Sequence, residues 1–310
     1  MNNVLYKPEG FLQIRDKNEG ISLSALEKAK NTGQILEARA IMCDNDHNLI
    51  VDFGEFRGII PREDAALGIR DGNIKDIAVL SRVNKSICFK VSEILKNNNE
   101  TYVLLSRLKA QEEALEYMLH YYTPGDVIDA KVTHLEPFGA FADIGCGIIG
   151  LISIENISVS RISHPKDRFY AGQNIKVVVK DIDFAQKRFT LSHKELLGTW
   201  HENAALFLTG QTVCGTVRSI EEYGIFVELT PNLAGLAEHK DFVEQGQQAT
   251  VYIKNIIPDK MKIKLSIIDY FCGEKPSCNH KYFITEGHID TFTYSPPESE
   301  RKIETFFNSR

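Results

Sequence analysis

The sequence predicts a mainly β protein in which three small barrels follow one another and are joined by short helical connectors. Two segments of the 310-residue chain, GDVIDAKVTHLEPFGAFADIG from Gly125 and GQTVCGTVRSIEEYGIFVEL from Gly210, share one pattern of glycines, aromatic residues and alternating apolar positions. A fainter copy begins at Gly33. Each copy is longer than a solenoid repeat of about 20–50 residues, so we expect each to fold as a small domain.

The strands expected within a copy are short, rich in β-branched residues, and bounded by Gly, Pro, Asn and Asp. In the third copy they cover residues 212–220, 225–229, 235–237, 249–257 and 262–266. This many short strands in so small a segment predict a closed or nearly closed barrel such as an OB-fold.

The segments between the copies have a helical pattern instead. Residues 108–122 place Leu108, Leu115 and Met118 at helical intervals, and residues 193–208 show a similar spacing. Near the N-terminus, Ser24 followed by Ala-Leu-Glu predicts a capping box that opens a short helix.

The resulting domain organisation has seven parts. They are an N-terminal extension with a short helix (1–32), a degenerate repeat 1 (33–109), a helical connector (110–124), repeat 2 (125–196), a second connector (197–209), repeat 3 (210–269) and a C-terminal appendage (270–310).

The composition fits an average folded protein, since 43% of the residues are hydrophobic and 25% are charged. No apolar run approaches the roughly 20 residues that span a bilayer, and the first residues do not form a signal peptide. The six cysteines include no C-x-x-C pair, so we expect reduced thiols and a cytoplasmic location. The net charge of −6 argues against nonspecific duplex binding and leaves single-strand binding open.

Repeats 2 and 3 resemble the S1 RNA-binding domain, a variant of the OB-fold. The shared pattern is a Gly, a V-x-G-x-V type strand, aromatic-Gly-x-Phe, G-L, a later G-Q, and a basic residue before L-S. Together the three copies span residues 33–269, and the chain resembles the short, Firmicutes-type members of the bacterial ribosomal protein S1 family.

The resemblance implies a set of RNA-contacting residues. Its stacking aromatics fall on Phe138 and Phe141 in repeat 2, and on Tyr223 and Phe226 in repeat 3. The family's His after G-L is replaced by Ser153 and Glu238. The full expected set is Phe138, Phe141, Arg161, His164, Arg168, Asp183, Lys187, Arg188, Tyr223, Phe226, His239, Lys254, Lys262 and Lys264.

Aromatic side chains suit this function because every base offers a π-face, so an exposed ring binds single strands without demanding sequence. We expect Gly139 to leave room for an approaching base. The alternative is that the rings belong to the core, where Phe is usually found. Strand alternation argues against it, because it places Phe141 on the same face as Asp143.

Basic residues would contact the RNA backbone. Repeat 2 has a basic loop, SRISHPKDRF, and repeat 3 has Lys262 and Lys264 on one face of its last strand. A solvated strand face is the alternative for these lysines.

Repeat 1 lacks the aromatic pair, because His47 and Ile50 occupy its positions. We expect it to bind RNA poorly and to present a protein-binding surface, as N-terminal domains of the family do on the small ribosomal subunit. Degeneration without any partner is the alternative.

Nothing in the sequence indicates an enzyme, since it has no P-loop, no G-x-S-x-G and no metal-binding helix motif. Cys272, Cys278, His280 and His288 in the tail do not have the spacing of a zinc site. We therefore expect no catalysis, no metal and no cofactor.

The expected function is that of a non-catalytic, single-stranded RNA-binding protein, monomeric off the ribosome. Through repeat 1 and the N-terminal helix it would associate with the 30S subunit and aid mRNA binding in translation. The alternatives are a regulatory RNA-binding protein without stable ribosome attachment, and a protein-interaction scaffold. The sequence leaves open the RNA sequence preference, the permanence of ribosome association, the orientation of the repeats and the role of the tail.

Overall fold

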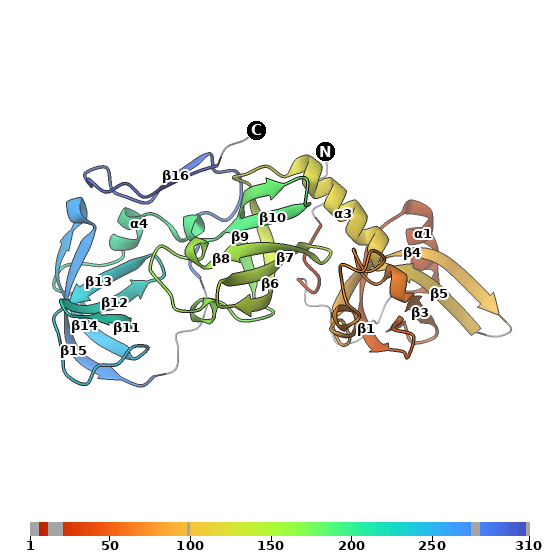
Figure 1. Ribbon diagram of the computed structural model, residues 1–310, viewed down its shortest axis with the longest axis horizontal. Coiled ribbons are helices and arrows are strands. Elements are labelled where there is room, and N and C mark those ends of the chain that lie inside the picture. Colours follow the sequence, from red (N-terminus) through yellow and green to blue (C-terminus); the bar gives the residue numbers. More distant parts are fainter. Residues whose placement is uncertain (1–5, 12–20, 98–99, 274–279, 308–310) are drawn as a thin grey trace. The chain divides into compact units, whose positions relative to one another are not determined.

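A computed structural model describes residues 6–11, 21–97, 100–273 and 280–307 (Figure 1). Its strands form three closed barrels of five strands each, which confirms the mainly β, tandem-barrel prediction. The chain divides into two compact units. Unit 1 consists of Met1–Tyr122, Asp129–Lys131 and Asp143–Ile149, and unit 2 of Thr123–Ile128, Val132–Ala142 and Gly150–Arg310.

Unit 1 contains the first barrel, with the strand order β1-β2-β3-β5-β4. Its strands are β1 (Leu36–Cys43), β2 (Leu49–Asp52), β3 (Arg57–Ile60), β4 (Ser86–Asn97) and β5 (Glu100–Ser106). The barrel closes through a parallel pairing of β3 with β5, while its other pairings are antiparallel. The strands are short and rich in β-branched residues, and their apolar side chains face the inside of the barrel. The core that they form includes the fully buried Leu49, Ile87 and Phe89.

Helix α1 (Leu23–Thr32) precedes the first barrel, but its cap differs from the prediction. The helix begins one residue before Ser24, and the hydroxyl of Ser22 accepts a hydrogen bond from the Ala25 amide at 3.3 Å. Ser22 has the extended backbone that a capping residue needs, so it is the N-cap and Ser24 belongs to the first turn. Gly33, with φ of 70°, ends the helix in the left-handed region.

Helix α3 (Arg107–Tyr121) confirms the predicted helix after repeat 1, with Leu108, Leu115 and Met118 buried. A buried ion pair anchors its start, because Arg107 Nε donates to Glu9 Oε1 at 2.7 Å. The Glu9 amide in turn donates to Asp143 Oδ2 at 2.8 Å. Burial, reinforced by the charge of Glu9, raises the pKa of Asp143 to about 7.

Unit 2 holds most of the second barrel and all of the third. The second barrel has the order β10-β8-β7-β6-β9, and the third has β11-β12-β13-β15-β14. The second-barrel strands are β6 (Val127–Glu136), β7 (Gly139–Gly145), β8 (Ile148–Ser153), β9 (Asn174–Asp183) and β10 (Arg188–Ser192). The third-barrel strands are β11 (Thr212–Glu221), β12 (Gly224–Thr230), β13 (Leu233–Ala237), β14 (Gln248–Ile257) and β15 (Lys262–Phe271). These last five match the strands expected from the sequence to within a few residues at each end, apart from a longer β15.

The connector between the second and third barrels is less helical than its spacing predicts. It contains a 3-10 turn (Lys194–Leu197) and the short helix α4 (Trp200–Ala204). Gly198, with φ of 83°, separates the two, and Thr199 opens α4 with a capping box to Glu202. The buried Trp200 makes this connector part of the core of unit 2.

The tail strap, residues 280–307, packs on both barrels of unit 2 and contains the hairpin β16 (Thr291–Thr293) and β17 (Glu304–Phe306). Against the second barrel, the Tyr282 hydroxyl accepts a hydrogen bond from the Lys176 amide at 3.2 Å. Against the connector and the third barrel, the Tyr294 carbonyl accepts from the Trp200 amide at 2.9 Å, and Phe292 enters the buried cluster. The appendage expected on repeat 3 therefore contacts repeat 2 as well.

Candidate nucleic-acid interface

The aromatic pair expected on each of repeats 2 and 3 has the same geometry in both barrels. The ring centroids of Phe138 and Phe141 lie 6.0 Å apart at an interplanar angle of 89°. Those of Tyr223 and Phe226 lie 6.1 Å apart at 88°. In each pair the ring in the turn is exposed, with 56% of Phe138 and 69% of Tyr223 accessible, while the ring on the strand is half-buried. The turn rings are therefore not core residues.

Gly139 and Gly224 lie where the backbone of the neighbouring strand leaves no room for a side chain. A Cβ at Gly139 would lie 2.4 Å from the Ile152 carbonyl oxygen, and one at Gly224 would lie 2.4 Å from that of Ala237. The neighbouring strand therefore approaches the glycine directly. The close contact of strand backbones is a structural reason for glycine at this position, and the expectation that Gly139 makes room for a base stays a prediction.

The strand register of the third barrel places a lysine near the aromatic pair. Phe226 on β12 pairs with Leu236 on β13, which pairs with Lys264 on β15. Lys262 lies on the same exposed face of β15, as strand alternation predicts. A π-surface and two ammonium groups thus share one face of this barrel.

The second barrel places charges of both signs at the end of its last hairpin. Arg188 on β10 pairs in register with Asp183 on β9, and both side chains are exposed, as is that of Lys187. At the register position that corresponds to Lys264, this barrel has Thr190, which pairs with Leu151 and Asp181. The face of repeat 2 is therefore less basic than the face of repeat 3.

Arg168 is placed differently from the sequence expectation. Only 2% of it is accessible, and its guanidinium pairs with Glu228 of the third barrel, which also pairs with Arg218 at 2.9 Å. A buried arginine needs such a partner, because an unpaired buried charge is strongly destabilising. Arg168 thus joins repeats 2 and 3 within unit 2 and is not available to a ligand.

Three of the four remaining expected residues already have a partner within the chain. Arg161 is exposed in the loop before Arg168, and His164 caps the 3-10 turn Pro165–Asp167 by accepting from the Lys166 amide at 3.1 Å. Lys254 pairs with Glu238 at 2.9 Å, and that hydrogen bond lowers the pKa of Glu238. His239 lies 2.9 Å from the Glu221 carbonyl oxygen.

Two further observations correct the sequence analysis of repeat 2. Asp143, expected to be exposed beside Phe141, is buried, because the Glu9, Gly145 and Gly147 amides donate to it. His134, which the sequence analysis did not select, lies 6.3 Å from Phe141 at an interplanar angle of 29°. The signal for His134 would have been its position opposite Phe141 on the preceding strand.

The first barrel has an apolar row where the third has its aromatic and basic residues. Met42 pairs with Ile50, Ile50 with Ile59, and Ile59 with Leu104. Leu104 in turn pairs with Glu93, whereas Lys264 of the third barrel pairs with Asn255. The face of repeat 1 is therefore more apolar and carries an acid. Ile50 is only 9% accessible, so the surface isoleucine expected at this position is buried instead.

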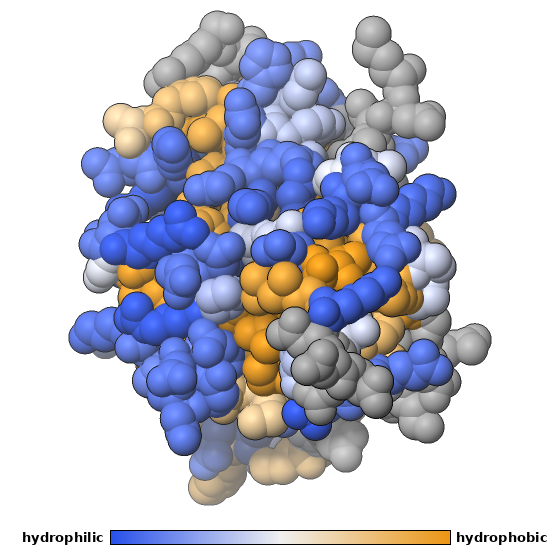
Figure 2. Space-filling model, turned by 90° about the vertical axis from the view of Figure 1, so that its right-hand side faces the viewer, coloured by the Kyte–Doolittle hydropathy of each residue, from blue (hydrophilic) through white to orange (hydrophobic). Residues whose placement is uncertain are grey.

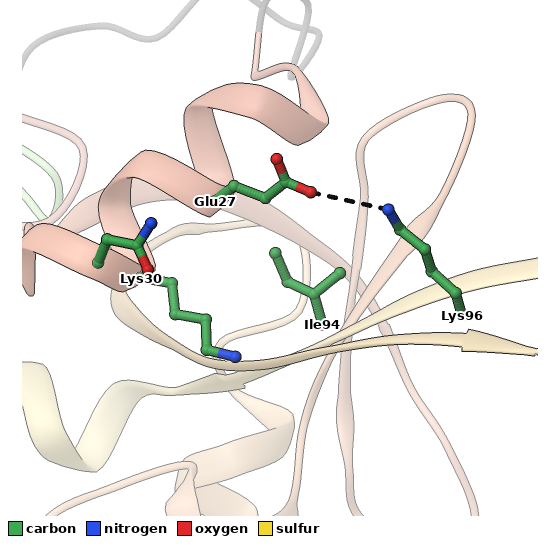
Figure 3. Close-up of a pocket in the computed structure, with 5 residues that line it drawn as sticks. Glu27, Lys30, Ile94 and Lys96 are labelled. Atoms are coloured by element: carbon green, nitrogen blue, oxygen red, sulfur yellow. Dashed lines mark ion pairs between the residues drawn. The ribbon is translucent and has the colours of Figure 1, made fainter.

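A shallow depression of about 420 Å³ lies between α1 and β4 of unit 1. Figure 3 shows Glu27 and Lys30 on α1 facing Ile94 and Lys96 on β4. Glu27 and Lys96 form an ion pair of 3.7 Å, and both side chains are largely accessible. A solvent-exposed pair of this kind contributes little to stability or binding, so we assign no ligand to the depression.

The part of the chain that the structure describes holds no group of three or more His, Cys, Asp or Glu placed for a metal ion. Of the tail residues considered for zinc, Cys278 lies outside the described residues. His280 donates to the Arg168 carbonyl at 2.9 Å, and His288 contacts Asp126 at 2.7 Å. Nor is any helix in the described ranges both long and apolar enough to cross a membrane.

Three five-stranded barrels, two of them with the same edge-on aromatic pair, define a protein built of tandem S1-type OB-fold domains. The family model described as S1 RNA binding domain matches residues 121–194, which hold the second barrel. The small ribosomal subunit protein bS1 of Staphylococcus aureus (strain COL) is 34% identical over 262 residues, 79% of this chain and 64% of that protein. The chain is thus similar to bacterial ribosomal protein S1 over most of its own length.

A second curated relative matches over the same share of both chains. The bS1 protein of Staphylococcus epidermidis (strain ATCC 35984) is 34% identical over 264 residues, again 79% of this chain and 64% of that protein. The chain thus spans 64% of the length of these curated relatives. The solution structure of GSP13 from Bacillus subtilis is 25% identical with a TM-score of 0.22, covering 23% of this chain and 55% of that one.

Proposed function

We propose that repeats 2 and 3 bind single-stranded RNA through their aromatic pairs. The observation that carries this proposal is the recurrence of one edge-on geometry in two barrels, with the outer ring exposed each time. A ring that is excluded from the core and held rigidly by a turn loses little entropy when a base stacks on it. Each such stack contributes about 1–3 kcal/mol.

The charges around each pair supply the remaining affinity. In repeat 3, Lys262 and Lys264 lie on the same barrel face as Phe226 and can contact phosphates beside a stacked base. In repeat 2, Arg188 and Lys187 provide the basic group, with Asp183 in register beside them. Stacking should therefore dominate in repeat 2, and phosphate contact should matter more in repeat 3.

Repeat 1 is proposed to bind protein. Its row of Met42, Ile50, Ile59 and Leu104 offers no ring for a base. Met42 is its exposed member, with 47% accessible, while Ile59 and Leu104 are half-buried and Ile50 is buried. Figure 2 shows apolar side chains at the surface among polar ones on one side of this unit. An apolar strip bordered by polar groups suits a protein partner better than a polyanion.

Together these features support a non-catalytic protein that works in the cytoplasm on the 30S ribosomal subunit and aids mRNA binding during translation. Repeat 1, with α1 beside it, would dock on small-subunit proteins, and repeats 2 and 3 would hold the mRNA. Off the ribosome the protein is proposed to be a monomer. The relatives reported above carry the name of a small ribosomal subunit protein.

The RNA-binding part of the proposal is tested with the full chain and two oligonucleotides of equal length. An unpaired strand should bind more tightly than a duplex, because stacking on exposed rings requires unstacked bases. Fluorescence anisotropy measures both affinities. Equal affinity for the two would contradict the proposal.

Docking is tested by the Met42→Glu variant of the full chain, because unit 1 includes part of the second barrel and deleting residues 1–110 would disturb that barrel. A charge on the apolar row should abolish co-sedimentation with 30S subunits and leave affinity for a free strand unchanged. Leu208→Glu, which changes an exposed apolar residue of unit 2 outside both aromatic pairs, is the matched control. Undiminished co-sedimentation of Met42→Glu would exclude this face as the dock.

A further inference from the structure

His134 adds a further ring to the aromatic surface of repeat 2. Its imidazole lies nearly parallel to Phe141, at 29° and 6.3 Å, whereas Phe138 meets Phe141 edge-on. Phe141 thus has two ring neighbours, each in a different orientation. The His134 side chain is 64% accessible. Packing of the core therefore does not explain the position of the ring.

A carboxylate fixes the His134 ring. Nε2 of His134 lies 2.6 Å from Oε1 of Glu136, two residues further along β6. Because an ionised carboxylate only accepts hydrogen bonds, Nε2 must be the donor. The same carboxylate repels phosphate, so this end of the site suits a base and disfavours the sugar-phosphate backbone.

The third barrel provides an internal comparison. Ser219 of β11 is the register partner of Phe226, and Tyr223 and Phe226 reproduce the edge-on pair. Repeat 3 therefore has the two-ring arrangement without a third ring. The basic residue that repeat 3 has at Lys264 is Thr190 in repeat 2. Compared with each other, repeat 2 has an additional ring at His134 and repeat 3 has an additional cation at Lys264.

We propose that His134 is a third base-stacking residue, which makes repeat 2 the site that prefers large unpaired bases. This inference rests on the proposed RNA binding and adds a residue and a base preference to it. Purines present a larger π-face than pyrimidines, so the additional ring favours adenine over uracil. Repeat 3, with Ser219 and Lys264, discriminates less between bases.

The test compares three full-length variants by anisotropy on labelled oligo(A) and oligo(U). His134→Ser, which installs the repeat 3 residue, should weaken oligo(A) binding by roughly fivefold or more, the lower end of one stacking contact. The loss for oligo(U) should be smaller. His134→Tyr restores a ring without an imidazole and should recover oligo(A) affinity. If His134→Ser acted by disturbing the local structure or by removing the imidazole contact with Glu136, His134→Tyr would not recover it. Phe138→Ala serves as the reference for the proposed function.

The outcomes separate the two proposals. If His134→Ser binds like the unaltered protein while Phe138→Ala loses affinity, the role of His134 is refuted and RNA binding by repeat 2 stands. If His134→Tyr is as weak as His134→Ser, stacking is not what His134 provides, and the inference also fails. If Phe138→Ala has no effect either, the proposed function of repeat 2 fails with it. Melting temperatures of all variants should agree with that of the unaltered protein, since His134 is exposed.

Discussion

Replacing Phe138 and Tyr223 together by alanine should weaken RNA binding strongly without unfolding the protein. Each base–aromatic stack contributes about 1–3 kcal/mol, so two lost stacks at the lower limit amount to about 2 kcal/mol. This corresponds to an affinity about 30-fold weaker at 25 °C. More than half of each ring is accessible, so the apolar area lost from the folded state is small.

The assay is fluorescence anisotropy with a labelled single strand, accompanied by thermal unfolding of the same samples. Phe306→Ala is the matched control, because Phe306 is 64% accessible and lies on β17 of the tail strap, outside both aromatic pairs. Affinity that stays within a factor of two of the unaltered protein would refute the stacking argument. A large fall in melting temperature would show that the two rings support the barrels instead.

Three further predictions follow from the charges of unit 2. Lys262→Ala with Lys264→Ala should flatten the slope of log affinity against log salt by about 1.4, since each phosphate contact with a single strand contributes about 0.7; a slope unchanged over a salt titration would exclude these contacts. Glu228→Gln leaves the buried Arg168 without its carboxylate and should lower the free energy of unfolding in urea by about 3–5 kcal/mol, whereas a loss below 1 kcal/mol would contradict the buried pair. Burial lowers the pKa of His280 to about 4, so unfolding takes up a proton between that pH and about 6.5. The contribution of His280 to stability should therefore fall as the pH drops from 7 to 5, whereas that of Asp143 has the opposite sign. His280→Gln should shift the change in melting temperature between pH 7 and pH 5 toward greater stability at pH 5, and an unchanged pH dependence would contradict this reasoning.

The barrels and the aromatic pairs could be predicted from the sequence because their signals are local. Strand alternation, a Gly between two aromatic positions and a basic residue before the last strand all lie within a few positions of one another. Repetition of the same pattern at Gly125 and Gly210 gave two independent observations of each feature.

The role of Arg168 could not be predicted in this way. A basic residue in a loop is usually exposed, and its partner Glu228 belongs to the next barrel, so no local pattern joins them. Asp143 was misplaced for the same reason, since the Glu9 amide that covers it comes from a distant segment. His134 lies outside the pattern of the family resemblance, whose third base-contacting position falls after G-L, on Ser153 and Glu238.

The tail strap has a consequence for the order of synthesis. It follows both barrels in the chain, yet Phe292 belongs to the buried cluster of the third barrel, and Tyr282 contacts His193 beside the second. A nascent chain that ends before residue 280 exposes these surfaces to solvent. Unit 2 therefore completes its core only after its last segment has left the translating ribosome, and until then its two barrels are substrates for chaperones and proteases.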